Sequence, residues 1–215
     1  MKKSTFSLAM ALALSLVSTS HAAGYRGGRT AIEHTVTTPT LSQAEADGLL
    51  FMREEEKLAR DVYNSLYVTW KNRVFFNISR SEQKHMDSMK VLLERYGLDD
   101  PAAGKAAGEF ENAELQALYV QLVSEGFASE IAALMVGATI EEVDIIDIAE
   151  RAAEVEGNDD IAVAYDNLMS GSRNHLRSFV RQLERVGVTY QPQYLNQLEY
   201  EAIIYSALET GHRSR

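Results

Sequence analysis

Apolar residues recur at helical spacing along four long segments of this chain, and no proline interrupts them. Proline inside a helix removes a backbone hydrogen bond and clashes with the preceding turn, so its absence permits long helices. The chain has only three prolines, Pro39, Pro101 and Pro192, and all lie outside the periodic segments. We find no strand-type alternation and predict an all-α fold. The predicted long helices cover residues 42–70, 78–96, 129–155 and 160–186.

The connections between these segments predict how the helices are arranged. The first and second helices are joined tightly, as are the third and fourth, whereas residues 97–128 link the second to the third. This long link contains a predicted short helix at about residues 112–124. Two antiparallel hairpins with one long crossover form the ferritin-like type of four-helix bundle. Residues 194–208 predict a further short C-terminal helix.

The N-terminal residues predict export. Lys2 and Lys3 precede an apolar stretch over residues 6–17, which ends before Ser20-His21-Ala22, a small-x-small cleavage motif. The stretch is too short to span a bilayer. We therefore expect residues 1–22 to be a signal peptide that is cleaved near Ala22, which leaves a soluble periplasmic or secreted protein without membrane insertion.

The rest of the chain is predicted to form one domain with short flanking segments. Residues 23–41 lack apolar periodicity and are rich in glycine, so we expect a flexible leader. Residues 42–190 would form the four-helix bundle, and residues 191–215 a helical tail. The sequence leaves the oligomeric state open, a homodimer included.

Charge and composition narrow the possible partners. The chain has 21 basic and 31 acidic residues, and loss of Lys2 and Lys3 would leave a net charge near −12. Such a surface repels nucleic acid and attracts cations. There is no cysteine, which excludes thiol redox chemistry and cysteine-bound zinc.

Each predicted long helix carries a potential metal ligand within its apolar stripe. An ionisable side chain buried without a partner costs several kcal/mol, so these groups need a common counter-charge. The i, i+3 spacing of Glu82 and His85 places both on one helix face. Ferritin-like di-metal sites combine one Glu from each of two helices with Glu-x-x-His from each of the other two. By comparison with this pattern, we predict the metal ligands Glu55, Glu82, His85, Glu141 and His175.

The histidines support this prediction most strongly. Apart from His21, only His34 and His212 lie outside the helices, whereas His85 and His175 take matching positions in the second and fourth. His85 follows Glu55 by 30 residues, and His175 follows Glu141 by 34. This near-repeat is what a two-fold bundle with a central site requires.

Several of these assignments have alternatives. Ser79-x-x-Glu82 could be a capping box, which would use Glu82 at the start of the helix. Glu55 lies in a run of three glutamates, and its phase predicts that Glu54 and Glu56 are solvated.

The third and fourth helices leave two further choices open. Glu142 is almost as well phased as Glu141. The position three residues before His175 is Ser172 instead of the expected Glu, and Asp144 could supply the missing carboxylate.

Four motifs together resemble an uncharacterised bacterial and archaeal branch of the ferritin-like superfamily, a domain of unknown function. The resemblance covers residues 42 to about 190 and implies a four-helix bundle that binds iron. The motifs are Arg53-Glu54-Glu55-Glu56-Lys57-Leu58-Ala59-Arg60-Asp61-Val62-Tyr63, Ser81-Glu82-Gln83-Lys84-His85-Met86, Gly137-Ala138-Thr139-Ile140-Glu141-Glu142 and Gly171-Ser172-Arg173-Asn174-His175-Leu176.

Three functions fit the sequence. The first is a di-metal carboxylate protein, most simply di-iron with manganese as the alternative, that reacts with oxygen or peroxide as an oxidase or peroxide-reducing enzyme. Carboxylate and imidazole ligands suit both metals. The second is a protein that sequesters metal without turnover. The third is a metal-free helical interaction module whose ionisable groups pair with one another.

Overall fold

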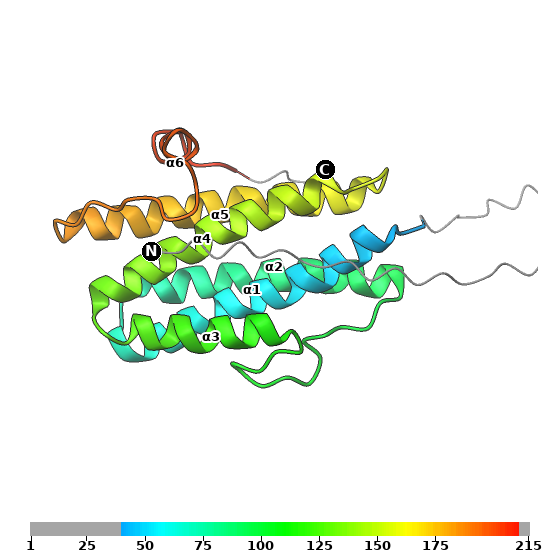
Figure 1. Ribbon diagram of the computed structural model, residues 1–215, viewed down its shortest axis with the longest axis horizontal. Coiled ribbons are helices and arrows are strands. Elements are labelled where there is room, and N and C mark those ends of the chain that lie inside the picture. The colour runs from blue at the N-terminus through cyan, green and yellow to red at the C-terminus, as the bar shows by residue number, and fades with distance from the viewer. Residues whose placement is uncertain (1–39, 211–215) are drawn as a thin grey trace, which may run out of the picture. The chain divides into compact units, whose positions relative to one another are not determined.

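The computed structural model describes residues 40–210, and this part of the chain contains six helices and no strand (Figure 1). The predicted all-α fold is confirmed. The predicted signal peptide and most of the predicted leader lie outside the described residues. No helix between residues 40 and 210 is long and apolar enough to cross a membrane. The helices are α1 (Gln43–Trp70), α2 (Arg73–Tyr96), α3 (Ala113–Gly126), α4 (Glu130–Ala153), α5 (Asp159–Arg185) and α6 (Gln197–Ile204).

The four long helices pack as two pairs, α1 with α2 and α4 with α5 (Figure 1). Only Lys71 and Asn72 separate α1 from α2, and residues 154–158 separate α4 from α5. These short links reverse the chain direction, so each pair is antiparallel. The pairs meet where α1 packs on α4 and α2 on α5, while α3 lies against α1 and α4, and α6 against α5.

Helix α2 begins five residues earlier than predicted, at Arg73 instead of Ile78. The side chain of Asn72 caps this end by accepting a hydrogen bond of 3.0 Å from the backbone N–H of Val74. Phe75 in the first turn is completely buried. A cap that satisfies a free N–H, together with this burial, stabilises the extra turn although its β-branched and aromatic residues are modest helix formers.

The predicted capping box at the start of α1 is present and also joins distant parts of the chain. Ser42 and Glu45 exchange hydrogen bonds of 3.1 and 2.8 Å between side chain and backbone. The second oxygen of Glu45 accepts from the N–H of Glu156 at 3.0 Å and the amide of Asn158 at 2.8 Å. Burial raises the pKa of Glu45, but these hydrogen bonds outweigh it and lower the pKa overall. The start of α1 is thereby tied to the link between α4 and α5.

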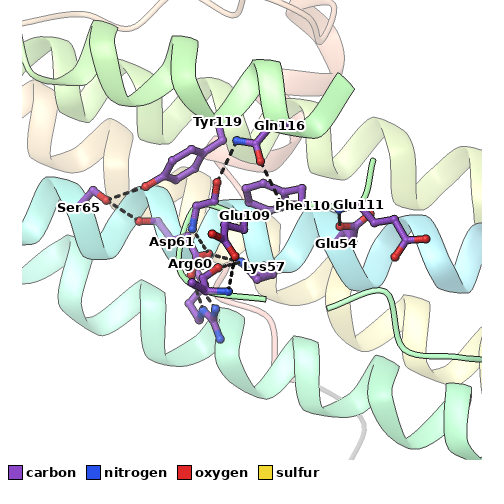
Figure 2. A network of polar contacts seen from close by, with 12 residues as sticks. Glu54, Lys57, Arg60, Asp61, Ser65, Glu109, Phe110, Glu111, Gln116 and Tyr119 are labelled. Carbon is purple, nitrogen blue, oxygen red and sulfur yellow. Dashed lines mark hydrogen bonds and ion pairs between the residues drawn. The ribbon is translucent and has the colours of Figure 1, made fainter. Parts of the chain in front are cut away.

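Charged residues of α1 hold the crossover between α2 and α3. Glu54, which was predicted to be solvated, is instead only 3% exposed. One oxygen accepts from the backbone N–H of Glu111 at 2.5 Å (Figure 2). The other accepts from the backbone N–H of Asn112 at 2.9 Å. Hydrogen bonds from backbone N–H groups to a carboxylate are among the stronger ones in proteins. The solvated assignment of Glu54 is therefore wrong, because the crossover covers this face of α1.

An ion pair one turn further along α1 holds the same segment (Figure 2). Lys57 and Asp61 are almost fully buried and lie 2.6 Å apart. Lys57 also donates to the carbonyl oxygen of Ala106 at 2.8 Å, and Asp61 accepts from the N–H of Gly108 at 3.0 Å. Gly108 has a positive φ of 79°, which favours glycine. Much of the charge in the Arg53–Tyr63 motif thus positions the crossover.

Candidate metal centre

Glu82, in the middle of α2, lies between two imidazole rings. One carboxylate oxygen, Oε2, is 2.8 Å from Nδ1 of His85, and the other, Oε1, is 2.8 Å from Nδ1 of His175 on α5. The two rings are stacked, with centroids 5.6 Å apart. Because α2 begins at Arg73, Glu82 lies well inside the helix, and Ser79 donates its hydroxyl to the carbonyl oxygen of Phe76. The capping-box alternative for Glu82 is therefore wrong.

Each histidine faces a second carboxylate from the other helix of its own antiparallel pair. Glu56 Oε2 on α1 lies 3.2 Å from Nδ1 of His85, and Glu141 Oε2 on α4 lies 3.4 Å from Nδ1 of His175. Two groups result, and within each group the potential ligand atoms lie within 4.8 Å of one another. Glu56, Glu82 and His85 form the first group, and Glu82, Glu141 and His175 form the second. Glu82 is common to both.

These groups are buried without a lysine or arginine partner. Glu56, Glu82 and Glu141 are each 1% exposed, and the ion pairs they form within the described residues are with His85 and His175. Glu56 Oε1, Glu82 Oε1 and His175 Nδ1 have no hydrogen-bond partner, although the last two are only 2.8 Å apart. Such atoms approach one another without hydrogen-bond geometry. This is the arrangement that a shared cation would satisfy, so the residues fit a metal.

The pKa values show that protons provide the positive charge in the absence of a cation. Burial raises the pKa of Glu56 to about 7, even though His85 acts to lower it. Burial lowers the pKa of His175, but the charges of Glu82 and Glu141 outweigh it and raise the pKa to about 10. Burial also raises the pKa of Glu82, but the two histidines hold it well below its usual range. A bound metal would replace the imidazolium protons, so metal uptake should release protons.

Tyr63 and Gly171 set the positions of individual site residues. The hydroxyl of the fully buried Tyr63 donates to Oε1 of Glu141, which leaves Oε2 to face His175. Gly171 lies against the ring of His85, and a Cβ atom at this position would be 2.5 Å from Cε1 of the ring. The close approach of His85 to α5 therefore requires a residue without a side chain.

Ser172 and Asp144 form a hydrogen-bonded pair beside the centre. Ser172 is completely buried and donates its hydroxyl to Oδ2 of Asp144. The other oxygen of Asp144, Oδ1, has no hydrogen-bond partner. Burial raises the pKa of Asp144, and the charges of Glu56 and Glu141 raise it further. Asp144 thus brings a carboxylate near the position where the sequence pattern lacks a glutamate.

The structure brings four of the five predicted ligands together, namely Glu82, His85, Glu141 and His175. The fifth, Glu55, is buried but belongs to neither group. Glu142 points elsewhere: its carboxylate accepts hydrogen bonds of 2.7 to 3.1 Å from the backbone N–H groups of residues 193–195. Of the two adjacent glutamates on α4, only Glu141 lies in the cluster.

Glu56 is the site residue that sequence reasoning missed. It was predicted to be solvated, yet it is 1% exposed and faces His85. Leu49, Met52 and Tyr63, at spacings of seven, four and seven residues from it, are completely buried. Residues at these spacings share one face of a helix, so the sequence did indicate that Glu56 is buried. The indication was ambiguous because α1 packs against α2, α3 and α4, so the helix face that carries Glu55 is buried as well.

Fold and site together define an all-helical protein with buried Glu and His groups that could hold metal. Residues 45–207 match the model of the family described as "Uncharacterized protein domain (DUF2202)", and the chain belongs to this family. It is 52% identical over 171 residues to "Uncharacterized protein MJ0754" of Methanocaldococcus jannaschii, covering 80% of this chain and 92% of that protein.

The crystal structure of hypothetical protein MJ0754 from Methanococcus jannaschii DSM 2661 matches with a TM-score of 0.77 and 50% identity. The match covers 80% of this chain and 97% of that one.

Proposed function

We propose that this protein is an exported, ferritin-like di-metal carboxylate protein, with a di-iron centre that reacts with oxygen or peroxide. The observation that carries the proposal is the carboxylate of Glu82, which directs one oxygen to each of two histidines. A carboxylate in this position can bridge two cations. The antiparallel pairs α1/α2 and α4/α5, joined by a long crossover, support the ferritin-like assignment.

The proposed ligands divide into two sets. Glu56 and His85 would hold one metal, Glu141 and His175 the other, and Glu82 would bridge them. Oxygen and imidazole donors without thiolates favour iron or manganese. A bound pair of such metals would supply the redox chemistry, by accepting electrons from a substrate or donating them to peroxide.

The surrounding residues orient the ligands and take up protons. Tyr63 holds Glu141 so that one oxygen remains free to bind. Ser172 holds one oxygen of Asp144 in the same way and leaves the second without a partner. Asp144 is therefore available as a fourth carboxylate, either as a ligand or as a proton acceptor beside the centre.

A reconstitution experiment with two matched variants tests the metal centre. Parent, Glu82→Gln and Glu142→Gln proteins are incubated with Fe²⁺ or Mn²⁺ without oxygen, desalted and measured by elemental analysis. Both substitutions remove one buried carboxylate, but only Glu82 lies between the histidines. We expect two metals per chain for the parent and Glu142→Gln, and at most one for Glu82→Gln. Equal metal content in the two variants, or none in the parent, would refute the proposal.

Turnover separates the oxidase or peroxide-reducing enzyme from a protein that only sequesters metal. The metal-loaded parent should consume oxygen or peroxide in the presence of a reductant, and Glu82→Gln should not. A parent that retains two metals without any consumption would be a metal-binding protein.

Export is a separate part of the proposal and rests on the N-terminal residues alone. Expression with the native N-terminus in a bacterial host should yield a protein outside the cytoplasm whose mass corresponds to cleavage after Ala22. An uncleaved cytoplasmic product would contradict it.

A further inference from the structure

A small cavity lies between α1, α3, α4 and the segment before α6. Its volume is about 80 Å³, room for a few water molecules. Its walls include Leu58, Leu118 and Tyr194, and the carboxylate-bearing residue Glu55 also lines it. A second, more open hollow of about 300 Å³ shares Leu122, Glu125 and Thr139 with it and adjoins it along α3 and α4.

Glu55 is the unusual residue in this cavity. It is 5% exposed, and its oxygen Oε2 has no hydrogen-bond partner. Burial raises the pKa of Glu55, and the carboxylates of Asp147 and Asp144 raise it further. A buried carboxylate among carboxylates is costly unless a cation or water satisfies it.

Asp144 lies on α4 next to Val143, which lines the cavity, and one turn after Glu141 of the metal centre. It also lies one turn before Asp147 on the same helix. Burial raises the pKa of Asp144, and the charges of the proposed ligands Glu56 and Glu141 raise it further. Its oxygen Oδ1 is buried without a hydrogen-bond partner, as Oε2 of Glu55 is. Two buried oxygens without partners result, one on Glu55 in the cavity wall and one on Asp144, a turn away from the ligand Glu141.

We propose that this cavity is the path by which a divalent cation reaches the metal centre, with Glu55 and then Asp144 as transient ligands. The inference rests on the proposed di-metal function. All-oxygen ligands suit a hard, partly hydrated ion such as Fe²⁺ or Mn²⁺, and the absence of imidazole keeps its binding weaker than at the centre. This assigns Glu55 to metal transfer, whereas the sequence had predicted a permanent ligand.

Loading kinetics test the path independently of the centre itself. Co²⁺, whose absorption changes on binding, is mixed with the metal-free protein in a stopped-flow instrument, and stoichiometry and affinity are measured at equilibrium. Glu55→Gln preserves size and removes the carboxylate, and Leu118→Trp fills the cavity. Glu45→Gln is the control, because Glu45 is equally buried but lines neither the cavity nor the centre. Clefts lined by carboxylates raise the association rate of cations by about 10- to 1,000-fold.

We expect Glu55→Gln and Leu118→Trp to load at least about tenfold more slowly than the parent, with unchanged stoichiometry, while Glu45→Gln loads at the parent rate. Unchanged loading in both cavity variants would overturn the inference. Loss of one metal from Glu55→Gln would also overturn it, because Glu55 would then be a ligand of the centre. If Leu118→Trp slows only peroxide consumption, the cavity admits the reactant instead of the cation. A parent that binds no Co²⁺ would refute the di-metal function itself, a result distinct from all of these.

Discussion

Gly171→Ala should separate the two metal positions, since it changes only the space available to one histidine. The new Cβ would lie 2.5 Å from Cε1 and 2.6 Å from Nε2 of His85, whereas ordinary contacts begin near 3.4 Å. The ring must therefore move by about 0.9 Å. The same Cβ would be 3.8 Å from Cε1 of His175, an ordinary contact, so that ring can stay in place.

A displacement of this size is large for a metal ligand. Metal–ligand distances are defined to about 0.2 Å, and altered support of a ligand typically costs 10–100-fold in affinity. We expect about 10–100-fold weaker binding at the position formed by Glu56 and His85, and little change at the position formed by Glu141 and His175. Alanine is also a better helix former than glycine by about 0.5–1 kcal/mol, so the weaker binding would not reflect a weakened α5.

Calorimetric titration of the metal-free protein with Mn²⁺ measures both positions. Val163→Ala, at a 49%-exposed position of the same helix, serves as the control and should bind as the parent does. If Gly171→Ala retains two positions of parental affinity, either His85 is not a ligand or its ring does not lie against α5. Equal weakening of both positions would show that the two histidines act as one site.

Four further predictions follow from other contacts. Metal removal should lower the melting temperature, because a ligand at a hundred times its dissociation constant stabilises the fold by about 2.7 kcal/mol; coincident melting curves of loaded and chelated protein would contradict this. Tyr63→Phe removes the hydroxyl that donates to Glu141, so titration should show one metal bound about 10–100-fold more weakly. Glu142→Gln should lower the free energy of unfolding by about 1–3 kcal/mol in urea, because the acceptor of the backbone N–H groups of residues 193–195 loses its charge. Burial raises the pKa of Asp100, but hydrogen bonds from Arg53 and a backbone N–H outweigh it and lower the pKa below 3.8. The stabilisation from Asp100 is therefore complete above its unfolded-state pKa and lost as the pH falls through the lower folded-state value, so Asp100→Asn should flatten the stability curve below about pH 4.

The sequence by itself determined the helical class and the approximate helix positions. Helical periodicity, the capping box at Ser42 and glycines at helix ends are local features, and the helix ends they predict agree with the structure to within a few residues except at the start of α2. The spacing of Glu82 and His85 is also local, since residues three apart on a helix share a face. Their meeting with His175 could be inferred because matched positions in two helix pairs face a common core.

Only the tertiary structure decided which neighbouring residue enters the cluster. Glu55 and Glu56 are both buried, as are Glu141 and Glu142, because α1 and α4 each pack on three other helices and burial no longer indicates a single face. Adjacent residues on a helix point about 100° apart. Which of two adjacent side chains faces a histidine depends on the packing of distant segments. The backbone N–H groups of residues 193–195 bind the carboxylate of Glu142, whereas Glu56 faces His85. Periodicity within one helix contains no information about these partners.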